Sequence, residues 1–460
     1  MKKTIFTVAT ALFVSSTMFA QLRATDQTGI NVFETPKTDT QFTGPKVEFG
    51  ASIAMPYIAL KNTNAASSQS AINQDPSKNS QALFKNSPNF ALSMANLYIN
   101  SYLADGITLQ VTMYLASKHH NETWVKGGYV QFDKIPFIKM DLLDNIMKYT
   151  SIKVGQMDVN YGDAHFRRSD GGNAIYNPFM ENYIMDEFAT EIGAEADVNY
   201  KGLIGVAGIT NGNLNPSLAY IDTTQTATKY SNGLHNPSFL LKLGFDKQLS
   251  EKFRARLTGS VYTTAGSLSN TLFGGDRTGS NYSAIMYNAA PGTGTAFGGR
   301  FNPSLTDKLT TFMGNLFLKY NLTDAVSVES FTTLESAKGR KPSEKLERKA
   351  NQFATDLVVR FGKTENFFVG ARYNTVSADV AAAAGATSTT TTATTTTLSP
   401  VAAYKIDINR LAISGGWYVT KNIMAKVEYA NQKYSNVPNV NYILNGYEFH
   451  GLSAEAVISF

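Results

Sequence analysis

The sequence predicts an all-β fold: a transmembrane antiparallel β-barrel of about 16 strands with an inward-folded third extracellular loop. Three observations support this prediction: apolar and polar residues alternate in many runs, short connections alternate with long ones, and the chain ends on a strand. We expect a signal peptide at 1–20, a periplasmic N-terminal segment at 21–44 and an outer-membrane β-barrel at 45–460. The expected location is therefore the outer membrane of a bacterial cell.

The first 20 residues have the composition of a secretory signal peptide. Lys2 and Lys3 precede an apolar run, and small residues follow up to Ala20. The run is too short to span a bilayer, and no later stretch approaches the roughly 18 apolar residues of a transmembrane helix. The chain has no cysteine, so we expect neither a lipoprotein nor a disulfide. Without the two lysines the net charge is about +3, too little to indicate nucleic-acid binding.

Strands are predicted by alternation with a period of two residues. In "FRARLTGSV", Phe253, Leu257 and Val261 share one face, and Arg254 and Arg256 share the other. The same split occurs in five further runs, at 239–245, 312–320, 353–361, 368–375 and 423–429. In none of these runs does the apolar face carry a charge.

The connections decide between a soluble sandwich and a membrane barrel, because alternation is compatible with both. Turns of two to four residues alternate with long loops near 61–88, 161–188, 212–236, 264–309, 337–350, 377–402 and 435–444. Outer-membrane barrels combine short periplasmic turns with longer extracellular loops in this way. The expected strands are 45–60, 89–103, 107–117, 122–132, 151–160, 189–200, 202–211, 237–247, 252–263, 310–320, 325–336, 351–361, 366–376, 403–419, 423–434 and 445–460.

Three segments depart from the expected regularity, and the first is the turn at 118–121, which is short where a long loop is due. Residues 133–150 are long where a short turn is due, and Met140, Leu143 and Met147 have helical spacing. A short amphipathic helix at the periplasmic rim is one interpretation, and plain packing against the barrel is the other. In "IDINRLAISGGW" the alternation changes phase between Asn409 and Leu411, which predicts a β-bulge.

The chain ends with "LSAEAVISF", in which Leu452, Ile458 and Phe460 lie on one face. The last strand of a barrel must pair with the first, because unpaired backbone groups in hydrocarbon cost several kcal/mol each. A strand that ends on phenylalanine resembles the assembly signal of bacterial outer-membrane proteins. The resemblance implies that the barrel-assembly machinery recognises the strand ending at Phe460.

The third extracellular loop, 161–187, is rich in aromatic and charged residues, whereas the other loops are rich in serine, threonine and alanine. We expect it to fold into the lumen. "IKVGQMDVNYGDAHFRRSDGG" followed by "NPFMENYIMD" resembles the porins of Bacteroidota and, more distantly, the phosphate-selective porin superfamily. In that family a long loop constricts the pore, and trimers are common, so the resemblance implies a constricted pore and a possible homotrimer. The chain lacks the dense lysine and arginine ladder of the phosphate-selective members, which argues against phosphate selectivity.

A barrel of 16 to 18 strands is wide enough for an aqueous channel, so we expect a porin for passive diffusion of small hydrophilic solutes. The residues expected at the pore constriction and on the lumen wall are Arg167, Arg168, Asp170, Glu181, Glu191, Glu195, Lys242, Arg254, Arg256, Lys319, Arg360 and Arg372. Arg167, Arg168, Arg254 and Arg256 suggest a mild anion preference. The alternative is that these charges cancel in ion pairs.

Other classes of function have weaker support in the sequence. No motif surrounds the five histidines, so neither an enzyme, a metal site nor a cofactor is expected. A transporter for a hydrophobic or bulky ligand is one alternative, although 21–44 is short for a plug domain. A surface adhesin or structural barrel is another, suggested by the threonine-rich tract 381–400. The expected partners are outer-membrane lipid and lipopolysaccharide, small solutes and the assembly machinery, and not nucleic acid.

Overall fold

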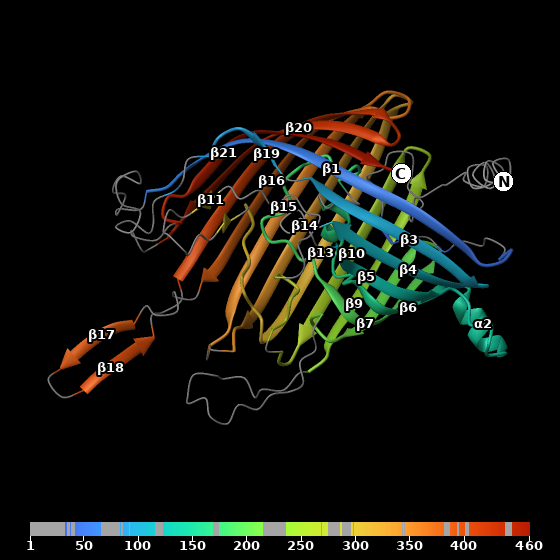
Figure 1. Ribbon diagram of the computed structural model, residues 1–460, viewed down its shortest axis with the longest axis horizontal. Helices are drawn as coiled ribbons and strands as arrows, with labels where there is room; N and C mark the ends of the chain where they lie inside the picture. The colour runs from blue at the N-terminus through green and yellow to red at the C-terminus, as the bar shows by residue number, and fades with distance from the viewer. Residues whose placement is uncertain are drawn as a thin grey trace, which may run out of the picture.

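The computed structural model shows a closed β-barrel, with one short hairpin lying apart from its wall (Figure 1). It describes residues 33–34, 37, 42–65, 83, 86–91, 93–115, 123–168, 174–214, 236–267, 269–274, 286–287, 296–297, 299–342, 344, 346–380, 387–392, 395–400, 404–437 and 444–460. The expected signal peptide, residues 1–20, lies outside these ranges.

A single antiparallel sheet forms the wall, and apart from the two-residue β2 (Asn89–Phe90) it has the expected 16 strands. They are β1 (Lys46–Thr63), β3 (Met94–Ala104), β4 (Ile107–Leu115), β5 (Thr123–Phe132), β6 (Thr150–Asp158), β7 (Thr190–Tyr200), β8 (Leu203–Thr210), β9 (Ser238–Ser250), β10 (Phe253–Thr264), β13 (Lys308–Thr323), β14 (Val326–Arg340), β15 (Arg348–Phe361), β16 (Phe367–Val380), β19 (Tyr404–Thr420), β20 (Ile423–Ser435) and β21 (Glu448–Ser459). Most boundaries lie within three residues of those predicted, because the alternation begins and ends with the strands.

The sheet closes between the first and last strands. β1 pairs with β3 on one edge and with β21 on the other, in a register that places Ile53 opposite Ile458. Phe460 continues this pairing, since its N–H donates to the carbonyl of Ala51 at 2.9 Å and the reverse bond has the same length. Every wall strand is therefore paired on both edges, as a sheet in hydrocarbon requires.

The barrel has the reverse polarity of a soluble protein. On β9, Leu241 and Leu243 are exposed, whereas Lys242 between them is buried. On β15, Leu357 is exposed, whereas Asp356 and Arg360 are buried. The outer surface is thus apolar and the interior charged, which is the arrangement of a barrel with lipid outside. The architecture places the protein in the bacterial outer membrane.

Short turns lie at the barrel end where both termini of the wall meet, and this end is the periplasmic one. The β7–β8 turn consists of Lys201 and Gly202, both with positive φ, at 53° and 89°. A side chain on Gly202 would put Cβ 2.8 Å from the carbonyl oxygen of Asp246, so glycine is required there. The opposite end carries the small hairpins β11 (Met286–Tyr287) with β12 (Ala296–Phe297) and β17 (Thr387–Thr392) with β18 (Thr395–Pro400).

Among the described residues, two short helices interrupt the β structure. The helix α2 (Asp141–Met147) lies between β5 and β6, in the segment where helical spacing was seen. The 3₁₀ helix η2 (Ala164–Arg167) lies in the long connection after β6. No helix among the described residues is both long and apolar enough to cross a membrane.

The bulge predicted between Asn409 and Leu411 is wrong. β19 pairs without interruption through this stretch with both β16 and β20, and its register shifts only between Tyr418 and Thr420. The phase change arises because Ile406 and Ile408 are buried inside the barrel, in an apolar cluster with residues such as Tyr447. The phase change in the apolar pattern therefore marks the place where the inner face of the strand is covered by apolar residues. It does not mark a change in backbone register.

Candidate pore constriction

Among the parts of the connections that the structure describes, the one between β6 and β7 is the most buried. We call residues 159–168 and 174–189, the parts that the structure describes, the β6–β7 segment. All but Tyr176 are buried, including Phe166, Phe179 and Tyr183. Many of its polar contacts are with side chains of the inner face of the barrel, and three groups of them bind the segment to the wall.

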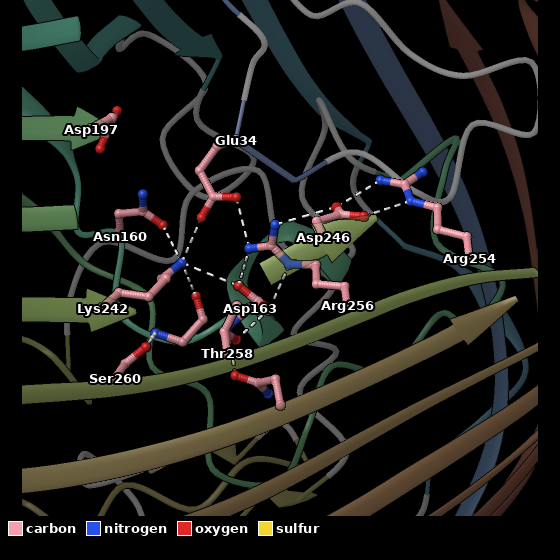
Figure 2. A network of polar contacts seen from close by, with 12 residues as sticks. Glu34, Asn160, Asp163, Asp197, Lys242, Asp246, Arg254, Arg256, Thr258 and Ser260 are labelled. Carbon is pink, nitrogen blue, oxygen red and sulfur yellow. Dashed lines mark hydrogen bonds and ion pairs between the residues drawn. The ribbon is translucent and has the colours of Figure 1, made fainter. Parts of the chain in front are cut away.

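The first group is centred on Asp163, at the start of η2. Arg256 on β10 donates to its carboxylate through Nε at 2.9 Å and Nη2 at 2.8 Å, and Thr258 donates through its hydroxyl at 2.7 Å. Lys242 on β9 lies 3.2 Å away and also donates to the carbonyl of Gly162 at 2.7 Å. Figure 2 shows these contacts. They bind the segment to two neighbouring strands.

Glu34 completes this cluster from a part of the chain before the first strand (Figure 2). Its carboxylate lies 3.0 Å from Nζ of Lys242 and 2.7 Å from Nη2 of Arg256. The adjacent Phe33 is buried, with its ring centroid 5.8 Å from that of Phe166. The N-terminal segment therefore contacts the β6–β7 segment at residues that no sequence pattern had indicated.

Charge balance keeps the two carboxylates of this cluster ionised. Burial alone would raise the pKa of Asp163, but Arg256 and Lys242 outweigh that effect and hold the pKa well below its usual range. The pKa of Glu34 is lowered in the same way, since burial is outweighed by Lys242 and Arg256. The cluster is therefore two acids and two bases with little net charge.

The second group is centred on Asp356 of β15. Arg372 of β16 makes two bonds to its carboxylate, at 2.7 and 2.8 Å, a geometry that fixes both side chains. From the β6–β7 segment, Arg167 lies 3.3 Å from this carboxylate, and the Tyr183 hydroxyl donates to it at 2.9 Å. Arg372 also donates to the carbonyl of Glu181 at 2.8 Å.

The third group binds the middle of the segment to β20. Lys426 donates to the carbonyl oxygens of Ala174, Asn177 and Phe179, at 3.0, 3.0 and 3.1 Å. Glu428 accepts the N–H of Met180 at 2.7 Å. These are contacts to backbone groups, so they depend on the path of the segment and not on its sequence.

Lys426 and Glu428 lie on the charged face of the predicted strand, but the sequence did not distinguish them from other inward charges. Arg410 of β19 was also missed, because the apparent bulge obscured its face. Its guanidinium is buried and lies 3.7 Å from the carboxylate of Glu181. Burial raises the pKa of Glu181, and Arg410 and Arg372 offset only part of that effect.

Two more of the predicted arginines are each paired with an aspartate. Arg168 makes two bonds to Asp186, at 2.8 and 3.0 Å, within the segment. Arg254 pairs with Asp246 at 2.8 Å. Asp170 lies outside the described residues.

Two further groups lie away from the segment. Lys319 and Arg360 share Glu329, at 3.4 and 3.0 Å. On β7, Glu195 pairs with Lys153 at 3.0 Å, while Glu191 accepts from the hydroxyls of Thr210 and Tyr262. Lys319, Arg360 and Glu195 thus each have a partner of opposite charge, whereas Glu191 is bound by hydroxyl groups.

The described residues contain no cluster of three metal-ligating side chains, and His119 and His120 fall outside them. Two histidines lie among the described residues, His165 in the β6–β7 segment and His450 on β21. The ring of His165 lies 3.9 Å from that of Phe166, and His450 lies 3.8 Å from Glu448.

No family model and no curated protein matches this chain. Among solved structures, the outer-membrane expressed OmpT of Vibrio cholerae is similar at 10% identity, with a TM-score of 0.47 over 92% of this chain and 99% of that one. The outer membrane channel DcaP of Acinetobacter baumannii matches at 12% identity and a TM-score of 0.47, over 91% and 99% of the two chains. An anion-selective porin from Comamonas acidovorans matches at 9% identity and 0.45, over 91% and 100%.

Proposed function

We propose that this protein is an outer-membrane porin, a passive diffusion channel for small hydrophilic solutes that the β6–β7 segment constricts. The observation that carries the proposal is the combination of an apolar outer face with a charged inner face to which that segment is bound. A closed wall of 16 strands is too wide for its own side chains to fill. The material that narrows the lumen must then come from connections, and this segment contacts β9, β10, β15, β16 and β20.

The proposed channel has only a mild ion preference. Arg167, Arg168, Arg254 and Arg256, on which the predicted anion preference depends, each have a carboxylate within 3.5 Å. Paired charges leave a weaker field in the lumen than free cations would. We expect a reversal potential close to zero in a salt gradient, displaced slightly in the direction of anion selectivity.

The proposal is tested by electrical recording from purified protein in planar bilayers. Wild type should give discrete conductance steps. Asp356→Asn removes a carboxylate that binds both Arg167 and Tyr183, so its steps should be larger or more variable. The matched control is Asp105→Asn in the β3–β4 turn, where the aspartate pairs with exposed Lys134, and its steps should equal those of wild type.

The outcome separates the proposal from its alternatives. An absence of steps would refute the porin and favour a structural or adhesive barrel. Steps that a hydrophobic ligand blocks, with no passage of small sugars into loaded liposomes, would favour a substrate-specific transporter.

Three further features belong to the same proposal. Recognition by the barrel-assembly machinery is expected at Phe460, which is exposed at the end of β21. A homotrimer and membership of the Bacteroidota porins are expected from the sequence resemblance alone. Cross-linking in detergent would test the trimer.

A further inference from the structure

The long periplasmic connection between β5 and β6 exposes an unusual amount of apolar surface. We call residues 137–149 the foot. Its exposed apolar side chains are Phe137, Ile138, Met140, Leu142, Ile146 and Tyr149. In Figure 1 the helix α2 of the foot lies at the end of the barrel, beside β6 and clear of the wall. Packing against the barrel, one of the two interpretations of the sequence, accounts for only part of this segment.

The helix α2 uses half of its apolar side for contact with the protein. At about 100° per residue, Leu142, Ile146, Leu143 and Met147 span a continuous arc, while Asp141 and Asp144 lie opposite. Met147 is 4% exposed, so that edge of the arc packs on the protein. Leu142 and Ile146 are 67% and 49% exposed, so the other edge has no contact that buries it.

Both ends of the foot join the lipid-facing surface of the barrel. At one end Tyr149 packs edge-on against Tyr200, with ring centroids 4.7 Å apart. Tyr200 and the nearby Leu203 are exposed at the periplasmic ends of β7 and β8. At the other end Phe137 packs edge-on against Phe132, the last residue of β5, at 6.4 Å. The apolar surface of the foot is therefore continuous with the surface that the barrel presents to lipid.

We propose that the foot is a membrane-surface element, with Leu142 and Ile146 inserted among the phospholipids of the periplasmic leaflet. An amphipathic helix of this kind lies at the boundary between headgroups and acyl chains. The acidic residues Asp141 and Asp144 would then face water. Lys139 precedes the helix, where a long side chain can reach lipid phosphates while its stem stays in the apolar layer. The inference depends on the outer-membrane location and not on transport.

The absence of cysteine from the chain makes a site-specific test direct. Leu142→Cys carries an environment-sensitive fluorophore, and Asp144→Cys on the opposite face of α2 is the matched control. Both proteins are reconstituted in vesicles of phosphatidylethanolamine and phosphatidylglycerol. We expect blue-shifted emission at position 142 and at least threefold stronger quenching there by phospholipids with a nitroxide near the carbonyl group. Equal accessibility of both positions to aqueous iodide, without lipid quenching, would overturn the proposal.

The test also distinguishes lipid from a protein partner. A blue shift at position 142 that lacks lipid quenching and disappears at one barrel per vesicle would assign the foot to contact between copies, and would overturn the proposal. Heat-dependent gel mobility verifies that each labelled barrel has folded. If Leu142→Cys fails to fold, Ile146→Cys with Asn145→Cys as its control applies the same criterion.

Discussion

The substitution Asp163→Asn should release the start of the β6–β7 segment from the barrel wall. Asp163 is fully buried and accepts bonds from Arg256, Thr258 and Lys242 at 2.7 to 3.2 Å. Breaking a buried ion pair by removing one partner costs about 3–5 kcal/mol. We expect about 3 kcal/mol here, because asparagine keeps one acceptor oxygen and Glu34 still compensates both cations. At about 1.4 kcal/mol per tenfold change, local opening becomes roughly 100-fold more frequent.

Hydrogen exchange of the detergent-solubilised protein measures this opening. The N–H of Gly162 donates to Ser260 at 3.1 Å and that of Asp163 to Asn315 at 2.9 Å, so both amides exchange only when the segment leaves the wall. Their protection should fall roughly 100-fold, as local opening requires. The control Asp246→Asn removes a carboxylate near the same arginine but outside the segment. Equal protection in wild type and Asp163→Asn would show that the cluster does not hold the segment, and would refute the reasoning.

Three further predictions concern pH, closure and close packing. Because the pKa values of Glu34 and Asp163 are lowered, their ionised carboxylates stabilise the fold at pH values above the usual carboxyl range near pH 4. This contribution to stability is lost as the pH falls through the lowered pKa values. In thermal unfolding from pH 7 to pH 3, stability should therefore fall only below about pH 4, and it should fall less in Asp163→Asn. Deleting Phe460 removes two backbone bonds to Ala51 and should reduce the heat-modifiable, folded fraction on a gel. Gly244→Ala puts Cβ 2.3 Å from the carbonyl oxygen of Leu257 and should cost about 1–3 kcal/mol, seen as a lower unfolding temperature, whereas Gly259→Ala, with open space around it, should not.

The wall of the barrel could be predicted from the sequence because lipid imposes a simple rule on it. Side chains that face hydrocarbon must be apolar, so runs such as 353–361 reveal both the strand and its orientation. The inner face obeys no such rule. Ile406 and Ile408 point inward to an apolar cluster, and the sequence could not distinguish this from a bulge.

The contacts of the β6–β7 segment were less predictable, because they join residues far apart in the chain. Arg256 lies on the polar face of its predicted run and is buried, but nothing in its neighbourhood in the sequence identifies Asp163 or Glu34 as its partners. Glu34 is 208 residues from Lys242, and the segment that contains it has no periodicity. Alternation indicates which way a charge points, whereas its compensation depends on tertiary structure.

The contact between Phe33 and Phe166 also bears on how the protein is prepared for measurement. If cleavage occurs after Ala20, only the stretch from Gln21 to Phe33 separates the new amino terminus from a side chain buried in the barrel. An affinity tag fused to that terminus would be tethered close to the β6–β7 segment that it is meant to leave undisturbed. A tag placed in the threonine-rich tract 381–400 would be far along the chain from this contact, and recordings from the two tagged forms would reveal any interference.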